Sequence, residues 1–343
     1  MFAVIDCGTT NTRIYMVSDE GALITQGVKK VGVRDTSITG SRKALKSGVE
    51  ELFRSILSEH KIDLKDVRFA IASGMITSEI GLIEIPHLVA PVGLKELSEQ
   101  IKIVTDPDVV DLGVPVYFVR GIRNDYGDGA TAHALRRVDF MRGEEVQCMG
   151  ILKQLDPKLP VNIVVLSSHT KLIHIDEQGR IAASITTMSG QIFEALKNST
   201  NVGKSIVACG GEDAGGYTFE ELVSIAKDCV ENAGFVRTML MPRFMQVLLK
   251  TNSDERQLFV DAAIAVDDIK AFREFNQMGF ASERFILFGH ESRCKLYTYL
   301  IHETFGAGVD VSSIFDPEAI ADLTIKGAIA TASHVLGSGR ADK

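Results

Sequence analysis

Acidic and hydroxyl residues follow directly on the first apolar segment of the chain. Residues 2–5 are apolar, and the residues of interest after them are Asp6, Gly8, Thr9, Thr10 and Arg13. A turn of this composition can hold a phosphate with backbone N–H groups and hydroxyls, and Arg13 can add positive charge. Because a carboxylate and a phosphate repel each other, Asp6 would act through a water-bound Mg²⁺ ion. The alternative is that these residues form only a hairpin with an Asx turn.

A second, weaker turn of the same kind occurs in the other half of the chain. Residues 162–166 are mainly apolar, and the polar residues that follow are Ser167, Ser168, His169, Thr170 and Lys171. Lys171 is a compact positive charge suited to a terminal phosphate, and the alternative is a solvated lysine in a hairpin. One such turn in each half predicts that two lobes clamp a nucleotide.

Two adjacent acids follow Gly143, which is expected to separate a strand from a helix. Glu144 and Glu145 would then lie in the first helical turn, where the helix dipole favours their ionised form. An ionised carboxylate there could take the proton of a hydroxyl that attacks a phosphoryl group. Successive helix residues project about 100° apart, so only one acid can face a given substrate. The alternatives are solvated acids at a helix start and, for Arg142, a surface salt bridge instead of a contact with a substrate carboxylate.

The order of the predicted elements indicates an α/β protein with an internal duplication. An apolar strand, a polar turn and a return strand open the chain and recur from residue 162. A second polar turn that ends in glycine follows in each half, at 18–21 and at 176–179. This parallel predicts that the two halves share one topology.

Two junctions near the C-terminus have clear local signals. A strand at 284–288 meets Gly289 before a helix begins, so backbone can approach a ligand there. The last helix is expected to begin at Pro317, with Asp316 as its N-cap, and to continue to Leu336.

Length, composition and charge limit the classes of protein to consider. A chain of 343 residues predicts two domains, which we place at 1–155 and 161–343 because two prolines interrupt the segment between them. A hydrophobic fraction of 45% and a charged fraction of 24% are typical of a globular protein. The formal net charge of −8 argues against nucleic acid as a partner.

The cysteines and the apolar segments predict a reduced, cytoplasmic environment. The five cysteines are odd in number and widely spaced, and none has a neighbour at a zinc-binding distance along the chain. The first residues lack a basic stretch followed by a long apolar segment, and no run of 18 apolar residues occurs. We therefore expect neither secretion nor membrane insertion.

Several motifs resemble, in order and spacing, those of one family of kinases. They are DCGTTNTR at 6–13, SGMITS at 73–78, PHLVAPVGL at 86–94, FMRGEEVQ at 140–147, SSHTKLIHI at 167–175, TTMSGQIFEAL at 186–196 and FGHESRCKLY at 288–297. Together they resemble the 2-dehydro-3-deoxygalactonokinase family of the sugar kinase, heat-shock and actin superfamily. The resemblance implies an α/β fold of two ribonuclease-H-like, actin-like ATPase lobes with a nucleotide cleft between them.

The resemblance also implies a reaction and a set of site residues. The reaction is ATP-dependent phosphorylation of a hydroxyl of 2-dehydro-3-deoxygalactonate, a small sugar acid. The positions of Asp6 and of Glu144 or Glu145 in the chain assign them the roles of Mg²⁺ ligand and base in that reaction. The implied nucleotide contacts are Gly8, Thr9, Thr10, Arg13, His169, Thr170, Lys171 and, for adenosine, Gly289. The implied sugar-acid contacts are Asn11, Gly74, Met75 and Arg142.

The chain departs from the family pattern beside these sites. The family usually has tryptophan where this chain has Cys7 and Leu172, and proline-glycine where it has Ser167 and Ser168. These departures leave the exact sugar acid open. A kinase for another sugar or acyl substrate, a non-enzymatic actin-like nucleotide binder and a phosphatase of the same superfamily therefore stay as alternatives, and a homodimer is one option.

Overall fold

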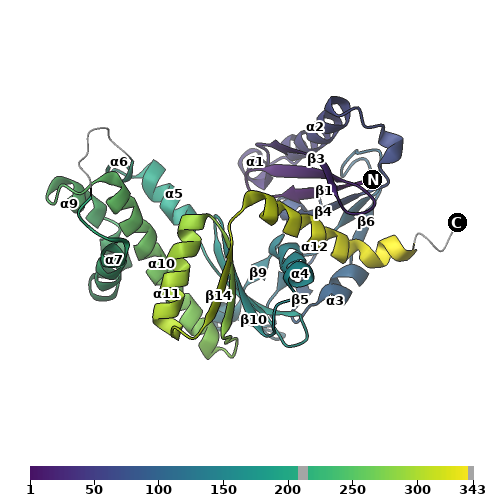
Figure 1. Ribbon diagram of the computed structural model, residues 1–343. Helices are drawn as coiled ribbons and strands as arrows, with labels where there is room; N and C mark the ends of the chain where they lie inside the picture. The colour runs from purple at the N-terminus through teal and green to yellow at the C-terminus, as the bar shows by residue number, and fades with distance from the viewer. Residues whose placement is uncertain (208–214, 339–343) are drawn as a thin grey trace. The chain divides into compact units, whose positions relative to one another are not determined.

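The computed structural model describes residues 1–207 and 215–338, and the chain divides into two compact units. The first unit comprises Met1–Pro160, Ile175–Ser184 and Asp316–Lys343, and the second comprises Val161–His174 and Ile185–Phe315. The lobes predicted from the sequence are continuous segments, whereas these units interleave. The C-terminal helix α12 (Pro317–Ser338) belongs to the first unit and lies alongside α4 (Glu144–Leu155; Figure 1).

Apolar segments of the first unit form a six-stranded sheet in the order β3-β2-β1-β4-β7-β6. The strands are β1 (Phe2–Cys7), β2 (Thr12–Val17), β3 (Leu23–Lys29), β4 (Ala70–Gly74), β6 (Lys102–Val104) and β7 (Val116–Phe118). β1 and β4 are buried along almost their whole length, as expected for central strands. Helices α1 (Val33–Thr39) and α2 (Lys43–Glu59) contribute Val33 and Phe53 to the core that also contains Ile5 of β1.

The second sheet repeats this arrangement with five strands in the order β12-β11-β10-β13-β14. The strands are β10 (Val161–Leu166), β11 (Thr170–Ile175), β12 (Ile181–Thr187), β13 (Arg284–Gly289) and β14 (Asp310–Ile314). β1 pairs with β4 in parallel, and β10 pairs with β13 in parallel at the matching place. The shared order supports the duplication that the sequence predicts.

Most of the helices lie in the second unit. They are α5 (Ser189–Ser199), α6 (Gly203–Ile206), α7 (Phe219–Ala233), α8 (Phe235–Thr238), α9 (Met241–Val247), α10 (Ser253–Gln277) and α11 (Glu291–Phe305). α10 is the longest of them, and α7 and α11 both pack against it. Buried residues therefore occur along the whole length of α10. Within residues 1–207 and 215–338, no helix is both long enough and apolar enough to cross a bilayer.

The remaining elements of the first unit are short. They are the strands β5 (Leu88–Val89), β8 (Ile122–Arg123) and β9 (Phe140–Met141), helix α3 (Leu94–Glu99), and three 3₁₀ helices, η1 (Leu64–Asp66), η2 (Met75–Thr77) and η3 (Ala132–Arg137). The three strands form a small sheet in the order β5-β8-β9. This sheet ends just before α4, the helix that carries the two adjacent acids.

Glycines bring α4 and α12 into backbone contact. A Cβ atom at Gly150 of α4 would lie 2.0 Å from the carbonyl oxygen of Leu323, and one at Gly327 of α12 would lie 1.9 Å from that of Val146. No larger residue fits at either position without moving a helix. This close packing explains why the C-terminal helix groups with the first unit and fixes the position of α4.

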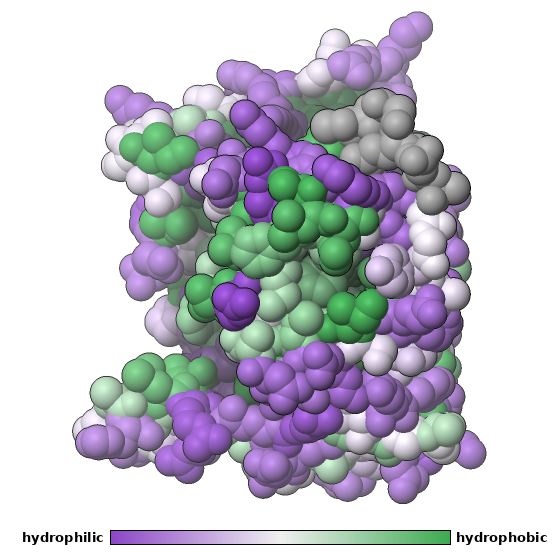
Figure 2. Space-filling view, turned by 90° about the vertical axis from the view of Figure 1, so that its left-hand side faces the viewer, coloured by the Kyte–Doolittle hydropathy of each residue, from purple (hydrophilic) through white to green (hydrophobic). Residues whose placement is uncertain are grey.

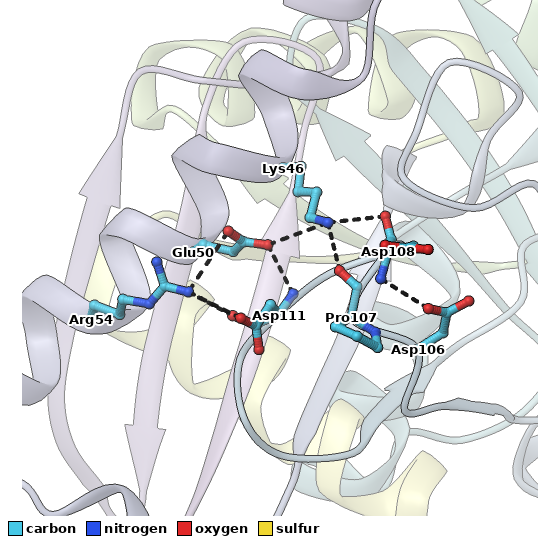
Figure 3. Close-up of polar contacts among 7 residues, drawn as sticks. All are labelled: Lys46, Glu50, Arg54, Asp106, Pro107, Asp108 and Asp111. Atoms are coloured by element: carbon cyan, nitrogen blue, oxygen red, sulfur yellow. Dashed lines mark hydrogen bonds and ion pairs between the residues drawn. The ribbon is translucent and has the colours of Figure 1, made fainter.

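A polar cluster joins α2 to the loop that precedes β7 (Figure 3). The Nζ of Lys46 donates to the carbonyl oxygen of Pro107 at 2.5 Å, and Glu50 Oε1 accepts from the backbone N–H of Asp111 at 2.8 Å. Arg54 forms ion pairs with Glu50 at 3.8 Å and with Asp111 at 3.5 Å. These contacts link α2 to the segment between β6 and β7.

Exposed apolar side chains are concentrated on α8, α9 and the residues that follow. They are Val236, Leu240, Phe244, Val247, Leu248 and Leu249, of which Val236 is 84% exposed and Leu248 is 72% exposed. Figure 2 views the molecule from the side of α7 and α9 and shows apolar surface gathered there. An exposed apolar patch of this kind is a candidate contact surface for another protein chain.

Candidate active site

In the turn between β1 and β2, carbonyl groups accept hydrogen bonds while two N–H groups stay free. The N–H of Gly8 donates to the carbonyl oxygen of Asn11 at 2.9 Å, and the N–H of Arg34 donates to that of Thr9 at 2.9 Å. The N–H groups of Thr9 and Thr10 form no hydrogen bond with any described residue. A Cβ at Gly32 would lie 2.4 Å from the Thr9 oxygen, so only glycine allows this approach. The turn therefore has free donors for an anion, as its sequence predicts.

Asp6 lies at the end of β1, opposite Arg13 of β2. One oxygen of its carboxylate is 3.7 Å from Arg13 Nη1. Burial raises the pKa of Asp6, the charge of Arg13 opposes this rise, and the charge of Glu144 adds to it. Two carboxylates of the first unit therefore repel each other, and a cation held there would relieve that repulsion.

Glycines also bring the start of α4 next to the end of β1. Gly74 ends β4 beside Cys7 with a φ of +89°, and a Cβ there would lie 2.4 Å from the Cys7 carbonyl oxygen. Gly143 has a φ of +108°, and its Cβ would lie 3.2 Å from the Cα of Gly74. Both positions therefore require glycine for conformation and for space. Glu144 consequently lies close enough to Asp6 for their charges to interact.

The two adjacent acids have different environments. Glu145 is fully buried, and both of its oxygens accept from the N–H of Gly143, at 2.9 and 2.8 Å. Burial, with a further contribution from the charge of Glu144, raises the pKa of Glu145 to about 8. Glu144 is only partly buried, but its Oε2 is buried and has no hydrogen-bond partner. Thus the Glu145 carboxyl is engaged by the N–H of Gly143 at the helix start, while Glu144 has a buried oxygen available for a ligand.

Arg142 is held inside the first unit. Its Nη1 donates to Thr77 Oγ1 at 2.8 Å, and its Nη2 donates to the carbonyl oxygen of Ile85 at 2.8 Å. Burial lowers the pKa of the guanidinium. The interpretation of Arg142 as a surface salt bridge is therefore wrong. Its contact with the sugar acid stays a prediction, as do those of Asn11, Gly74 and Met75, which lie in the turn after β1 and at the end of β4.

The turn between β10 and β11 repeats the arrangement of the first turn. The N–H of Gln191 in α5 donates to the carbonyl oxygen of Ser168 at 2.9 Å. A Cβ at Gly190 would lie 2.6 Å from the Ser167 carbonyl oxygen. In each unit, therefore, a glycine packs closely against the turn. Gly32 directly precedes helix α1 in the first unit, and Gly190 lies within α5 in the second.

Lys171 occupies the place in β11 that Arg13 occupies in β2. Each is the second residue of its strand, after Thr170 or Thr12. Lys171 is only 4% exposed, and its Nζ donates to Thr186 Oγ1 at 2.5 Å. The interpretation as a solvated hairpin lysine is therefore wrong. Its contact with a phosphate, like that of the neighbouring His169, stays a prediction.

A buried network behind the second turn was missed by the sequence analysis. Asp268 of α10 accepts from Ser189 Oγ at 2.5 Å and from the hydroxyl of Tyr297, which lies 3.2 Å from Thr170 Oγ1. Arg293 donates to the same threonine oxygen at 2.8 Å and to the Ser167 carbonyl at 2.7 Å. Burial raises the pKa values of Asp268 and Tyr297. The available signal was the spacing of Arg293 and Tyr297, four residues apart within FGHESRCKLY.

Gly289 is the counterpart of Gly74 in the second unit. It ends β13 beside Leu166 with a φ of +149°, and a Cβ there would lie 2.4 Å from the Leu166 carbonyl oxygen. Each unit thus has a glycine with positive φ at the end of the strand that pairs in parallel with its first strand. The adenosine contact proposed at Gly289 stays a prediction.

The described residues fit a Mg²⁺ ion that is bound mainly by phosphate and water. No group of three or more His, Cys, Asp or Glu with metal-binding geometry occurs in residues 1–207 and 215–338. A Mg²⁺ ion at a nucleotide site uses only one or two carboxylates and completes its shell with phosphate oxygens and water. Asp6 provides such a carboxylate.

The repeated strand order, with a polar turn after the first strand of each repeat, defines the actin-like ATPase class of fold. The activator of the 2-hydroxyisocaproyl-CoA dehydratase from Clostridium difficile, solved with bound ADPNP, has this fold and superposes with a TM-score of 0.50 at 8% identity, over 100% of this chain and 98% of that chain. The model of the 2-keto-3-deoxy-galactonokinase family matches residues 6–323, and the chain therefore belongs to that family. This confirms the family predicted from the motifs.

Two further relatives agree with this assignment. The curated protein of Rhizobium meliloti (strain 1021) named probable 2-dehydro-3-deoxygalactonokinase DgoK1 is 23% identical over 229 residues, which are 66% of this chain and 66% of that protein. The match thus spans just under two thirds of the relative. A crystal structure of a candidate 2-dehydro-3-deoxygalactonokinase from Sinorhizobium meliloti superposes with a TM-score of 0.72 at 19% identity, over 98% of this chain and 99% of that chain. The family is one of ATP-dependent sugar-acid kinases.

Proposed function

We propose that this chain transfers the γ-phosphoryl group of ATP to a hydroxyl of 2-dehydro-3-deoxygalactonate. Family membership and the names of the relatives support the substrate class. The observation that carries the mechanism is the buried Oε2 of Glu144, which has no hydrogen-bond partner and lies at a helix start beside Asp6. A buried carboxylate oxygen without a donor is costly, so a hydroxyl of the substrate is its natural partner.

Glu144 is the general base in this proposal. A carboxylate at this place can accept the proton of the attacking hydroxyl as the phosphoryl group is transferred. Glu145 is unsuited to that role because it is fully buried and both of its oxygens face the N–H of Gly143. It acts instead by holding Gly143 and the first turn of α4 in place, which positions Glu144.

Phosphate contacts are assigned in this proposal to one turn in each unit. In the first unit, Gly8, Thr9 and Thr10 offer N–H groups and hydroxyls, and Arg13 offers charge. In the second unit, His169, Thr170 and Lys171 contribute to the phosphates, and Gly289 allows the adenosine to approach the backbone. Asp6 would hold Mg²⁺ through water, where the ion would neutralise negative charge on the phosphates.

A coupled assay of ADP release over a panel of sugar acids tests the proposal. We expect 2-dehydro-3-deoxygalactonate to stimulate ADP release more than other keto-deoxy acids and hexoses do. Preference for another sugar or acyl compound would instead identify a different kinase on the same scaffold. ATP binding without any substrate-stimulated ADP release would favour a non-enzymatic nucleotide binder, and phosphoanhydride hydrolysis without a sugar would favour a phosphatase.

A homodimer stays a prediction, and the apolar patch on α8 and α9 is the first surface to examine. Its most exposed members, Val236 and Leu248, are suitable positions for a charged substitution. Sedimentation velocity of wild type and of Leu248→Lys would show whether this patch is a subunit contact, because a buried charge weakens such a contact strongly.

A further inference from the structure

His87 has a buried ring nitrogen without a partner inside the first unit. Its Nδ1 lies 3.5 Å from Nη2 of Arg142, and its ring centroid lies 5.2 Å from that of Phe140. Its Nε2 is buried and forms no hydrogen bond with any described residue. Buried polar atoms in native proteins nearly always have partners, so this nitrogen indicates a ligand that is bound during function.

The contact with Arg142 determines which nitrogen carries the proton. A guanidinium can only donate hydrogen bonds, so Nδ1 of His87 must be the acceptor. Burial, together with the charges of Arg142 and Arg123, lowers the pKa of His87 to about 4, so the ring is neutral near pH 7. A neutral ring whose Nδ1 accepts has its single hydrogen on Nε2. The buried nitrogen without a partner is therefore a donor, and its ligand must offer an acceptor.

The ring is fixed in place beside the residues already assigned to the site. A Cβ at Gly121 would lie 2.9 Å from Cδ2 of His87 and 2.4 Å from the carbonyl oxygen of Met141, so only glycine leaves room for the ring. Arg142, which the ring contacts, directly precedes Gly143 and Glu144 in the chain. His87 therefore contacts the residue that leads into α4.

The surrounding charges favour an anionic acceptor. Arg142, Arg123 and Arg120 are close enough to His87 to influence its titration, and each of them carries a positive charge. Glu79 is the acid that opposes them there. Of the charges that act on His87 itself, three are positive and one is negative, and this balance attracts a carboxylate more strongly than a neutral carbonyl or hydroxyl.

We infer that His87 recognises the carboxylate of the sugar acid through its Nε2–H and thereby distinguishes sugar acids from neutral sugars. This inference rests on the proposed function and adds a specificity residue to it. His87 positions the acid end of the substrate while Glu144 acts on a hydroxyl. Loss of the His87 imidazole should therefore weaken substrate binding more than it slows the chemical step.

Steady-state kinetics of two variants test this role. In His87→Phe, which keeps a ring but has no donor, we expect the KM for the sugar acid to rise about 10- to 100-fold, as for loss of one hydrogen bond to a charged group. We expect kcat to change less than about threefold and the KM for ATP to stay constant. His87→Gln, whose amide can place a donor near the position of Nε2, should recover most of the loss. The matched control is His133→Phe, at an exposed histidine of η3.

A substrate variant separates the carboxylate from the other oxygens of the sugar acid. The methyl ester of the substrate lacks the negative charge, so His87→Phe should cost much less with the ester than with the acid. An equal loss with both compounds would show that His87 binds another oxygen and would overturn the inference. An unchanged KM for the acid in His87→Phe would overturn it as well.

The unsubstituted protein provides a second measurement that does not depend on the folding of a variant. The ¹⁵N shifts of His87, assigned by comparison with His87→Gln, should show a neutral ring protonated on Nε2, and this N–H should shift when the sugar acid is added with ADP. A proton on Nδ1, or no response to the acid, would refute the inference. If wild type phosphorylates no sugar acid at all, the proposed function fails first, which is a distinct result.

Discussion

The buried carboxyl of Glu145 predicts a specific dependence of stability on pH. Its pKa is about 8 in the folded protein, whereas an accessible glutamate has an ordinary pKa of 4.5. Between these values the folded state keeps a proton that the unfolded state has released, so the free energy of unfolding falls as the pH rises. Each pH unit in this interval costs about 1.4 kcal/mol. From about pH 5.5 to about pH 7.5, Glu145 should therefore lower the stability by about 3 kcal/mol.

Glu145→Gln should remove this loss. A glutamine has the same shape, and its carbonyl oxygen can accept from the N–H of Gly143, but it has no proton to lose in this range. We expect the free energy of unfolding of the variant, relative to wild type, to rise by about 3 kcal/mol over the same pH range. Urea unfolding followed by far-UV circular dichroism is the suitable assay, because the chain has no tryptophan.

A second variant provides the control for this experiment. The charge of Glu144 raises the pKa of Glu145, so Glu144→Gln should keep the fall in stability but move its upper end to lower pH. If Glu145→Gln and wild type have parallel stability curves between about pH 5.5 and about pH 7.5, then Glu145 is ionised in the folded protein and the argument from burial is refuted.

Three further predictions concern the parts of the site. Glu144→Gln should lower kcat by about 10²- to 10⁴-fold with ATP binding nearly intact, and a normal rate in an ADP-release assay would exclude Glu144 as the base. Gly32→Ala should weaken ATP binding and destabilise the protein by about 1–3 kcal/mol, because the new Cβ would collide with the Thr9 carbonyl. Calorimetry should show neither effect in the matched control Gly308→Ala, where a Cβ has open space. Asp268→Asn should raise the KM for ATP by loosening Ser189 and Tyr297 around the second turn, and an unchanged KM would mean that this network does not position the turn.

Local signals in the sequence were sufficient for most of the elements that carry the site. The turn after β1, the helix start at Glu144 and the N-cap at Asp316, whose Oδ2 accepts from the N–H of Ala319 at 3.0 Å, all depend on residues close together in the chain. The family and the repeated topology were also predicted correctly, because the order of the motifs and the succession of strands and turns along the chain are properties of the sequence.

Burial and long-range partners were decided only by the tertiary structure. Glu144 and Glu145 are equivalent in local sequence, and they differ because the packing of Gly74 against Gly143 and of α12 against α4 buries one carboxylate completely. Tertiary packing likewise makes Lys171 a buried residue of β11 instead of a solvated one. The chain sequence thus determined which groups are present, while the tertiary fold determined which are desolvated. Desolvation sets both the protonation of a group and the energetic need for a ligand, and both depend on segments far apart in the sequence.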